Sequence, residues 1–147
     1  SAGDLISMIN GEQYGANKAV SDKENNQVLL AKRVQELNQE YGKIILAGHF
    51  CIFNADNSIE VLPESVYSAL NIKRIVLLEA DIQTIIANLR YRDGKEYSEK
   101  SINLLVEKER EQSERISKQL KCHLDIHKMT FTDSDFECIA FLLYGRG

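Results

Sequence analysis

The chain has few cysteines and no long apolar run, and both absences narrow its class. Its three cysteines, Cys51, Cys122 and Cys138, are widely spaced and form no CxxC pair. This argues against a disulfide framework or a zinc knuckle and favours a reducing compartment. No apolar stretch approaches the roughly 20 residues of a membrane-spanning helix, and the first residues do not resemble a signal peptide. We therefore expect a cytoplasmic protein with no membrane partner.

An excess of positive charge is also lacking over the chain as a whole. The 147 residues carry a formal net charge of -4 at pH 7, which argues against a general nucleic-acid binder. Nine of the eighteen Lys and Arg residues nevertheless fall between Arg90 and Lys121, so a local basic site is compatible with the composition. The length predicts a single domain over residues 1–147.

Residues 43–50, KIILAGHF, contain a short unbroken apolar run between two glycines. Such a run is typical of a strand that is buried on both faces of a parallel sheet. Gly48 and His49 follow at its carboxyl end, which is where ligands bind in open α/β sheets. We expect this strand to be central and its end to line a binding site.

The remaining elements are expected to alternate between helices and strands. The pattern predicts, in chain order, a helix over 25–41, a hairpin over 51–62, a helix opened by Pro63, a strand over 73–79, a helix capped by Asp81, a long helix from Ser98 to about 120, a strand over 123–129 and a helix capped by Asp133. This alternation indicates an α/β three-layer sandwich with a mainly parallel sheet and a short hairpin insertion.

Three main strands are few for such a sheet. The chain also opens with Ser1 instead of Met. We expect a fragment or trimmed chain that lacks its first strand and helix.

Helical periodicity also predicts which side chains face inward. The apolar stripe of the first long helix runs from Leu30 to Tyr41, and Phe136 is expected to face the core from the last helix. The middle turns of the long helix after Ser98 are almost wholly charged. This predicts a helix that crosses a cleft or packs only at its ends.

Residues 90–97, RYRDGKEY, form the most charged expected loop, with Gly94 as its pivot. Guanidinium groups such as those of Arg90 and Arg92 bind phosphate oxygens bidentately, and Asp93 is placed to orient one of them. The hypothesis assigns these three residues to phosphoryl transfer, which depends on charge neutralisation and positioning. The alternative is a solvated, charged helix end that is favourable to the helix dipole.

Weaker candidates lie elsewhere in the chain. His49 is placed to contact an acceptor phosphate or hydroxyl, or else is a satisfied histidine in a tight turn. Gln27 is placed to hydrogen-bond a base edge, or else is simply solvated. His123, Asp125 and His127 alternate along a strand at a spacing compatible with a metal. An exposed edge strand explains the same pattern, so we expect no metal site.

Three stretches, in order, resemble the adenylate-kinase-like branch of the P-loop kinases, particularly small ATP-binding proteins of the AAA type. They are residues 1–6 (SAGDLI), residues 44–50 (IILAGHF) followed by a hairpin and LPESVYSAL, and residues 75–98 (IVLLEADIQTIIANLRYRDGKEYS). The resemblance extends to about residue 129. It implies transfer of the γ-phosphoryl group of ATP, with Mg²⁺, to a small acceptor.

The resemblance also implies roles for single residues. Residues 90–120 correspond to a lid that carries Arg90 and Arg92 over ATP. The residues expected to face the acceptor are Gly3, Asp4, Gly48 and His49. For Asp4, a plain helix cap is the alternative.

Two departures from the family pattern leave other functions open. The phosphate-binding GxxxxGK[ST] run, in which backbone N–H groups and a lysine cradle phosphate oxygens, is absent from the 147 residues. Ala47 stands where the family often has an acidic residue near the magnesium. The alternatives are a catalytically inactive nucleotide-binding or regulatory module, and a fragment that binds no nucleotide.

Overall fold

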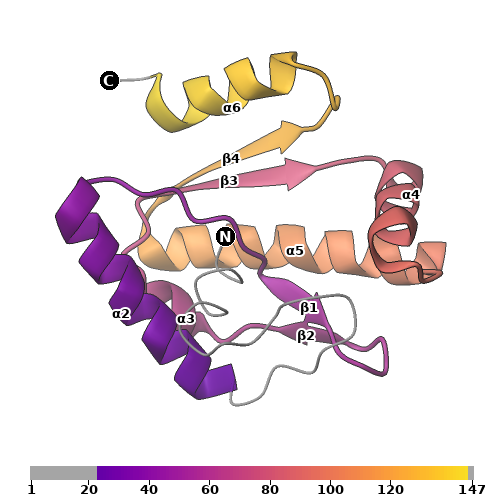
Figure 1. The fold of residues 1–147 in the computed structure, drawn as a ribbon, viewed down its shortest axis with the longest axis horizontal. Coiled ribbons are helices and arrows are strands. Elements are labelled where there is room, and N and C mark those ends of the chain that lie inside the picture. Colours follow the sequence, from indigo (N-terminus) through magenta and orange to yellow (C-terminus); the bar gives the residue numbers. More distant parts are fainter. Residues whose placement is uncertain (1–22, 146–147) are drawn as a thin grey trace. The chain divides into compact units, whose positions relative to one another are not determined.

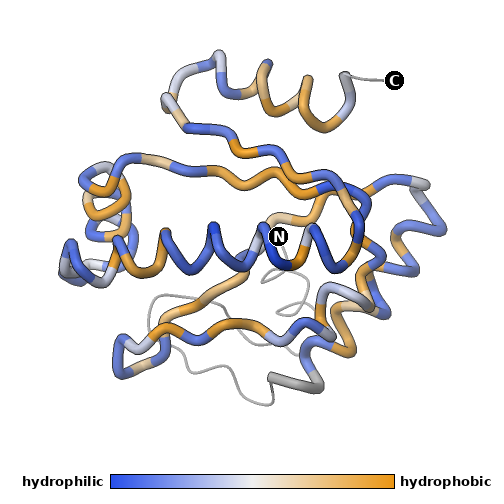
Figure 2. Tube along the Cα trace, turned by 180° about the vertical axis from the view of Figure 1, so that it is seen from behind, coloured by the Kyte–Doolittle hydropathy of each residue, from blue (hydrophilic) through white to orange (hydrophobic). Residues whose placement is uncertain are grey.

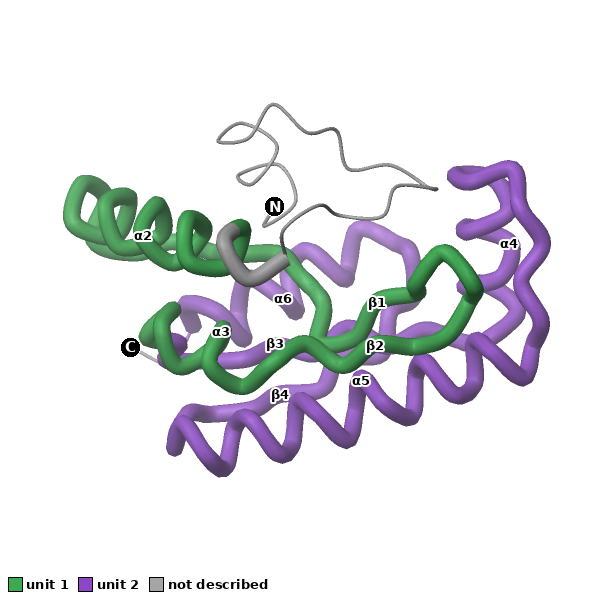
Figure 3. The backbone as a smooth tube through the Cα atoms, turned by 90° about the horizontal axis from the view of Figure 1, so that it is seen from below, with its two compact units in different colours: residues 1–71 green, residues 72–147 purple. Residues whose placement is uncertain are grey.

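The computed structural model describes residues 23–145. The elements in chain order are α2 (Lys23–Tyr41), β1 (Cys51–Phe53), β2 (Ile59–Val61), α3 (Glu64–Ala69), β3 (Arg74–Glu79), α4 (Ile82–Asp93), α5 (Glu99–Leu120), β4 (His123–Lys128) and α6 (Ser134–Tyr144) (Figure 1). The chain divides into two compact units, residues 1–71 and 72–147 (Figure 3).

In the first unit, α2 packs against α3 through the face that periodicity predicts. The cluster at this contact consists of Leu30, Val34, Ile44, Leu46 and Leu70. Gly42 ends α2 in the left-handed region, at φ 75°, and its N–H donates to the Asn38 carbonyl at 2.8 Å, as expected for a glycine stop. The predicted helix is confirmed, but Tyr41 is exposed and does not belong to the buried stripe.

Residues 43–50 do not form the buried central strand that the sequence predicts. No strand is present over residues 43–49, and Ile45 is 60% exposed, although Ile44 and Leu46 are partly buried against α2. A strand buried on both faces needs hydrogen-bonded neighbours for its backbone groups. Within residues 23–145, no strand pairs with this stretch. Its apolar side chains are therefore not sufficient to make it a strand.

The hairpin and the helix after it are confirmed. β1 and β2 pair antiparallel, with Cys51 opposite Val61. In the turn, the Ser58 N–H donates to Asp56 Oδ1 at 3.0 Å. Hydrogen bonds from the hydroxyl and the N–H of Ser58 lower the pKa of the Asp56 carboxyl. Pro63 directly precedes α3, where the missing N–H of proline is tolerated.

In the second unit, β3 and β4 pair in parallel. The register runs from Arg74 opposite His123 to Glu79 opposite Lys128, so both predicted strands are confirmed. Parallel neighbours cannot be joined by a tight turn, and α4 and α5 together form the crossover. Figure 1 shows α5 and α6 on opposite sides of the strand pair. The core includes Ile75 and Leu77 of β3 and Ile102 and Ile116 of α5.

The middle of α5 is not the solvated stretch that its charges predict. Gln112 and Ser113 are buried there, each about one turn before Ile116. Their polar groups have partners: the Ser113 hydroxyl donates to the Arg110 carbonyl at 2.8 Å, and Gln112 Oε1 accepts from Arg115 Nε at 3.0 Å. Ser113 and Gln112 can be buried in this helix because their polar groups keep hydrogen-bond partners within it.

The start of α6 differs from the prediction in two ways. Asp133 does not cap the helix with its side chain, and Phe136 is 77% exposed. The cause of the second difference is that the neighbouring Asp135 takes the buried position, and adjacent helix residues point about 100° apart. Near the other end, Arg74 Nη1 donates to the Leu142 carbonyl at 2.6 Å, which satisfies one of the unpaired last-turn carbonyls.

The described residues thus form a mixed α/β fold with two short two-stranded sheets, one antiparallel and one parallel. Hydrophobic residues are prominent along β3 and in α6 (Figure 2). Among the helices of residues 23–145, none has both the length and the apolar character needed to cross a bilayer.

The core of the second unit can be tested with two residues of α5. Ile102 is fully buried, whereas nearby Leu104 is exposed. We expect Ile102→Ala to lower the free energy of unfolding by about 2–5 kcal/mol, because it removes buried methyl groups and leaves a cavity. Leu104→Ala should lower it by less than about 1 kcal/mol. Urea unfolding of both variants checks this, and equal losses would contradict the assigned burial.

Candidate functional site

The cationic side chains proposed from the sequence lie on the last turn of α4, not in a loop. Asp81 caps the start of α4 as predicted, because its carboxylate accepts the Thr84 N–H at 2.9 Å. The helix continues through Asp93 and ends at Gly94, whose φ is 62° and whose N–H donates to the Arg90 carbonyl at 2.9 Å. The expected loop over residues 90–97 is therefore wrong in its first half. Residues 90–93 are helical because α4 continues until Gly94, which ends it in the left-handed conformation.

Asp93 is the centre of this site. Its side chain is 1% exposed, and it accepts from both Nε and Nη2 of Arg92, the latter at 2.8 Å. The Tyr97 hydroxyl donates to Asp93 Oδ2, also at 2.8 Å. A carboxylate removed from water needs such partners. The Arg92 hydrogen bonds hold the pKa of the Asp93 carboxyl below its ordinary value, although burial acts in the opposite direction.

The guanidinium of Arg92 is held by Asp93 along one edge, while the side chain as a whole is largely exposed. Its side chain is 66% exposed, and the hydrogen bond to Asp93 raises its pKa further. A guanidinium group presents two edges that each bind an oxyanion bidentately. Asp93 uses the edge made of Nε and Nη2, so the edge made of Nη1 and Nη2 is available to a second anion. Arg92 can thus bind a phosphate without breaking its pair with Asp93.

Two further cations lie beside this pair. Arg90 forms an ion pair with Glu96 at 2.7 Å, in which both side chains are well exposed. Such a surface pair is weak, so Arg90 can exchange Glu96 for a phosphate. Lys95 lies over the Tyr97 ring, 5.3 Å from its centroid. Three cations, together with the carboxylates of Asp93 and Glu96, therefore lie around the end of α4.

The candidates of the first unit form a separate group. Gln27 is half-buried in α2, and Gly48 and His49 are exposed just before β1. The Tyr67 hydroxyl donates to the His49 carbonyl at 3.2 Å and fixes this part of the backbone. Gly3 and Asp4 lie outside the described residues. The structure thus groups Arg90, Arg92 and Asp93 in one unit, and Gly48 and His49 in the other.

Sequence reasoning missed the buried carboxylate that follows β4. Asp135 accepts the Phe131 N–H at 2.7 Å, the Thr130 N–H at 3.1 Å and a hydrogen bond of 2.9 Å from His127 Nε2. Burial alone would raise the pKa of the Asp135 carboxyl, but these hydrogen bonds outweigh it and lower the pKa to about 2. The sequence signal was an acidic residue in the first turn of a mainly apolar helix, a position that it shares with Glu137.

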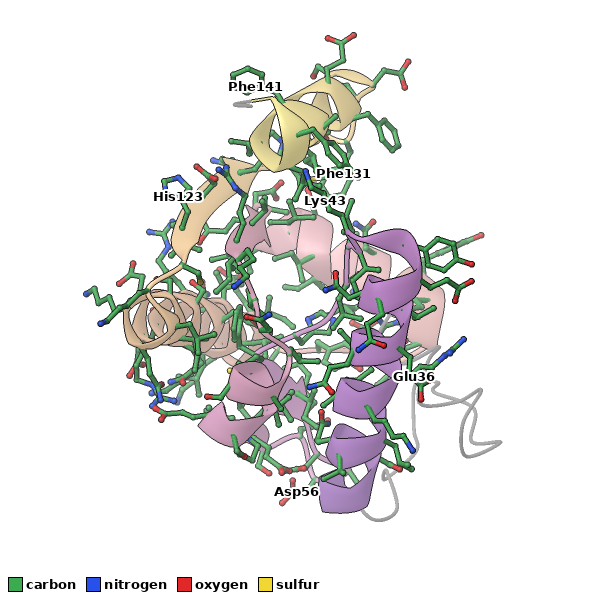
Figure 4. The ribbon with its side chains drawn as sticks, turned by 90° about the vertical axis from the view of Figure 1, so that its left-hand side faces the viewer. Glu36, Lys43, Asp56, His123, Phe131 and Phe141 are labelled. Atoms are coloured by element: carbon green, nitrogen blue, oxygen red, sulfur yellow. The ribbon has the colours of Figure 1, made fainter. Side chains whose placement is uncertain are left out.

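The histidines considered as metal ligands have different partners. His123 lies 3.2 Å from Asp125, which also pairs with Arg74 at 2.9 Å, whereas His127 contacts Asp135. Figure 4 labels His123 on β4. Among residues 23–145, no group of three or more His, Cys, Asp or Glu side chains is placed to hold a metal ion.

A family model described as an AAA domain matches residues 1–106, and this match places the protein among the P-loop NTPase and kinase-like proteins. The chain belongs to this AAA domain family. Proteins of this class generally use ATP and Mg²⁺. Among curated proteins, no match was found.

The glycine that ends α4 can be tested directly. A Cβ at Gly94 would meet nothing within 4 Å, but its φ of 62° is unfavourable for an L side chain. We expect Gly94→Ala to lower the free energy of unfolding by about 1–2 kcal/mol through this strain alone. Gly94→Asn should lose less, because asparagine tolerates the left-handed region. If thermal unfolding gives the alanine variant the stability of the native chain, the assigned turn is wrong.

Asp135 should make the free energy of unfolding depend on pH in the acidic range. Its folded pKa of about 2 lies below the unfolded value, which is about 3.9. The stabilisation is therefore present above about pH 4 and is lost as the pH falls toward about 2. We expect Asp135→Asn to be less stable at pH 7 and to show a smaller loss between pH 4 and 2.

The control for this prediction is Asp133→Asn, because the Asp133 side chain is exposed and makes no cap hydrogen bond. Urea unfolding at a series of pH values measures both variants. An Asp135→Asn profile that runs parallel to the native one would contradict the assignment.

Proposed function

We propose that the protein binds Mg-ATP and transfers its γ-phosphoryl group to a small acceptor, as nucleoside and nucleotide kinases do. The observation that carries this proposal is the end of α4, where the buried Asp93 holds one edge of Arg92 and leaves the other edge exposed. Phosphoryl transfer depends on neutralising charge on the phosphate oxygens and on positioning them. A guanidinium with a fixed orientation supplies both.

Arg92 and Arg90 lie two residues apart on the last turn of α4, so their side chains leave the helix in different directions. Arg92 is the group assigned to the triphosphate of ATP, because it can bind phosphate oxygens in addition to its present carboxylate partner. ATP, when bound with Mg²⁺, supplies the transferable phosphoryl group. Mg²⁺ usually keeps several waters and is held by one or two carboxylates together with phosphates. A preformed cluster of protein ligands is therefore not required.

The membership of the AAA domain family supports nucleotide binding. Because the 147 residues contain no GxxxxGK[ST] run, the arginines of α4 are the phosphate-binding groups that we assign in this chain. In this proposal residues 90–120 act as the lid, and Gly3, Asp4, Gln27, Gly48 and His49 line the nucleotide and acceptor site. The fold proposed for this domain is a three-layer α/β sandwich with a mainly parallel sheet.

The proposed setting is the cytoplasm. The three cysteines are free, which supports a reducing compartment. The proposed partners are a nucleotide and a small acceptor, with neither a nucleic acid nor a membrane.

A second candidate function is a nucleotide-binding or regulatory module without transfer activity. The observation that favours it is Ala47, which has no carboxylate at a position where the resemblance implies one. The two functions differ in a simple measurement. Both bind ATP, but only the kinase releases or transfers phosphate at a rate that depends on the α4 arginines.

The proposal is tested with Arg92→Lys in the full-length protein. Lysine keeps a cation beside the buried Asp93, whereas alanine would leave this carboxylate buried and unpaired. Lysine cannot, however, bind an oxyanion bidentately as arginine does. We expect ATP-dependent phosphate release to fall roughly tenfold to a hundredfold, as for the loss of a charged hydrogen bond of about 1.5–3 kcal/mol.

The matched control is Arg33→Lys, because Arg33 is a partly exposed arginine of α2 that pairs with Glu36. It should turn over ATP at the native rate. Native turnover in Arg92→Lys would remove the assignment of this arginine. Binding of ATP without any turnover in the native protein would favour the second candidate function.

A further inference from the structure

Tyr97 contacts the candidate site from the far side of the Gly94 turn. Its hydroxyl donates to Asp93 Oδ2 at 2.8 Å, so the hydrogen bond connects the last residue of α4 to the segment that leads into α5. The same carboxylate oxygen accepts from Arg92 Nη2. Asp93 therefore has one hydrogen-bonding partner that is itself a candidate for phosphate binding and one that is not.

The hydroxyl of Tyr97 has a stable donor role. Burial, together with the hydrogen bond to Asp93, raises the pKa of Tyr97 above its ordinary value, so the O–H remains protonated near neutral pH. Arg92 reaches the carboxylate from a long side chain that is 66% exposed. The partly buried Tyr97 ring supplies a second, more rigid attachment.

We propose that Tyr97 is a positioning residue: its hydroxyl fixes the Asp93 carboxylate and, through it, the direction in which Arg92 presents its free edge to a triphosphate. This inference rests on the proposed function. Tyr97 need not touch the nucleotide. Its effect is on orientation, which matters more for the transition state than for ground-state binding.

The ring and the hydroxyl of Tyr97 make separable contributions. The ring lies under Lys95 at 5.3 Å, and this contact is kept in Tyr97→Phe, which removes only the hydroxyl. Tyr91 provides a matched control on α4, because it is 95% exposed. Tyr91→Phe therefore makes the same chemical change two residues before the buried carboxylate, on a different side of α4.

The experiment measures phosphate release from Mg-ATP by the full-length protein. We expect Tyr97→Phe to lower kcat roughly fivefold to tenfold, which corresponds to about 1–1.4 kcal/mol, the typical net contribution of one hydrogen bond, and to change KM for ATP by less than about twofold. Tyr91→Phe should match the native protein. In an Arg92→Lys background, Tyr97→Phe should have no further effect on kcat, because the two residues act through one group.

A readout without nucleotide separates positioning from general stability. The Arg92 Nε–H group gives its own NMR signal, and its exchange with water should accelerate in Tyr97→Phe and stay unchanged in Tyr91→Phe. The thermal midpoint of Tyr97→Phe should remain close to the native value, since the ring is retained.

The outcomes distinguish the two proposals. If the native protein neither binds nor turns over ATP, the proposed function fails, and this inference fails with it. If the native protein is active and Arg92→Lys impairs it while Tyr97→Phe has native kcat and a native Arg92 signal, only the role of Tyr97 is overturned. A kcat loss of equal size in the presence and absence of Arg92 also overturns it.

Discussion

The parallel pairing of β3 with β4 is the constraint on which the second unit depends. Two parallel strands must be joined by a crossover, and here α4 and α5 supply it between Glu79 and His123. α4 therefore begins at the carboxyl end of β3, and α5 must return the chain to the start of β4. The turn between these helices lies at Gly94. The candidate phosphate-binding residues stand at this turn because the crossover reverses direction there.

Buried carboxylates hold both connections of this unit in place. Asp93 lies between α4 and α5 and takes its hydrogen bonds from Arg92 and Tyr97. Asp135 lies after β4 and takes its hydrogen bonds from His127 and from backbone N–H groups. A charge with few contacts to water is tolerated only where donors surround it. One donor to Asp93 is the guanidinium of Arg92, which uses only one of its two edges for this carboxylate. The contact that satisfies the buried Asp93 therefore also leaves a cationic edge that can bind an anion.

Much of the fold could be predicted from the sequence because the signals are local. The glycine stop at Gly42, the cap at Asp81 and the strand pattern over 73–79 each depend on neighbouring residues, and the structure confirms the stop, the cap and the strand. The strand is less buried than its apolar run predicts, since Leu78 is 50% exposed. The predictions that fail depend on distant contacts. Residues 43–50 carry a strand-like pattern, but a strand needs partners that no local pattern specifies. Phe136 is exposed because Asp135 takes the inward position.

The candidate site shows the same division. Spacing and composition were sufficient to select Arg90, Arg92 and Asp93, because charge density and a nearby glycine are visible in the chain itself. The sequence by itself thus determined the helices, the β3 and β4 strands and the chemistry available at the end of α4. Only the tertiary structure decided that Asp93 is buried, that Tyr97 bonds to it and that one edge of Arg92 stays exposed. Burial and hydrogen-bond direction depend on how the chain folds back over the Gly94 turn, which no single stretch of sequence encodes.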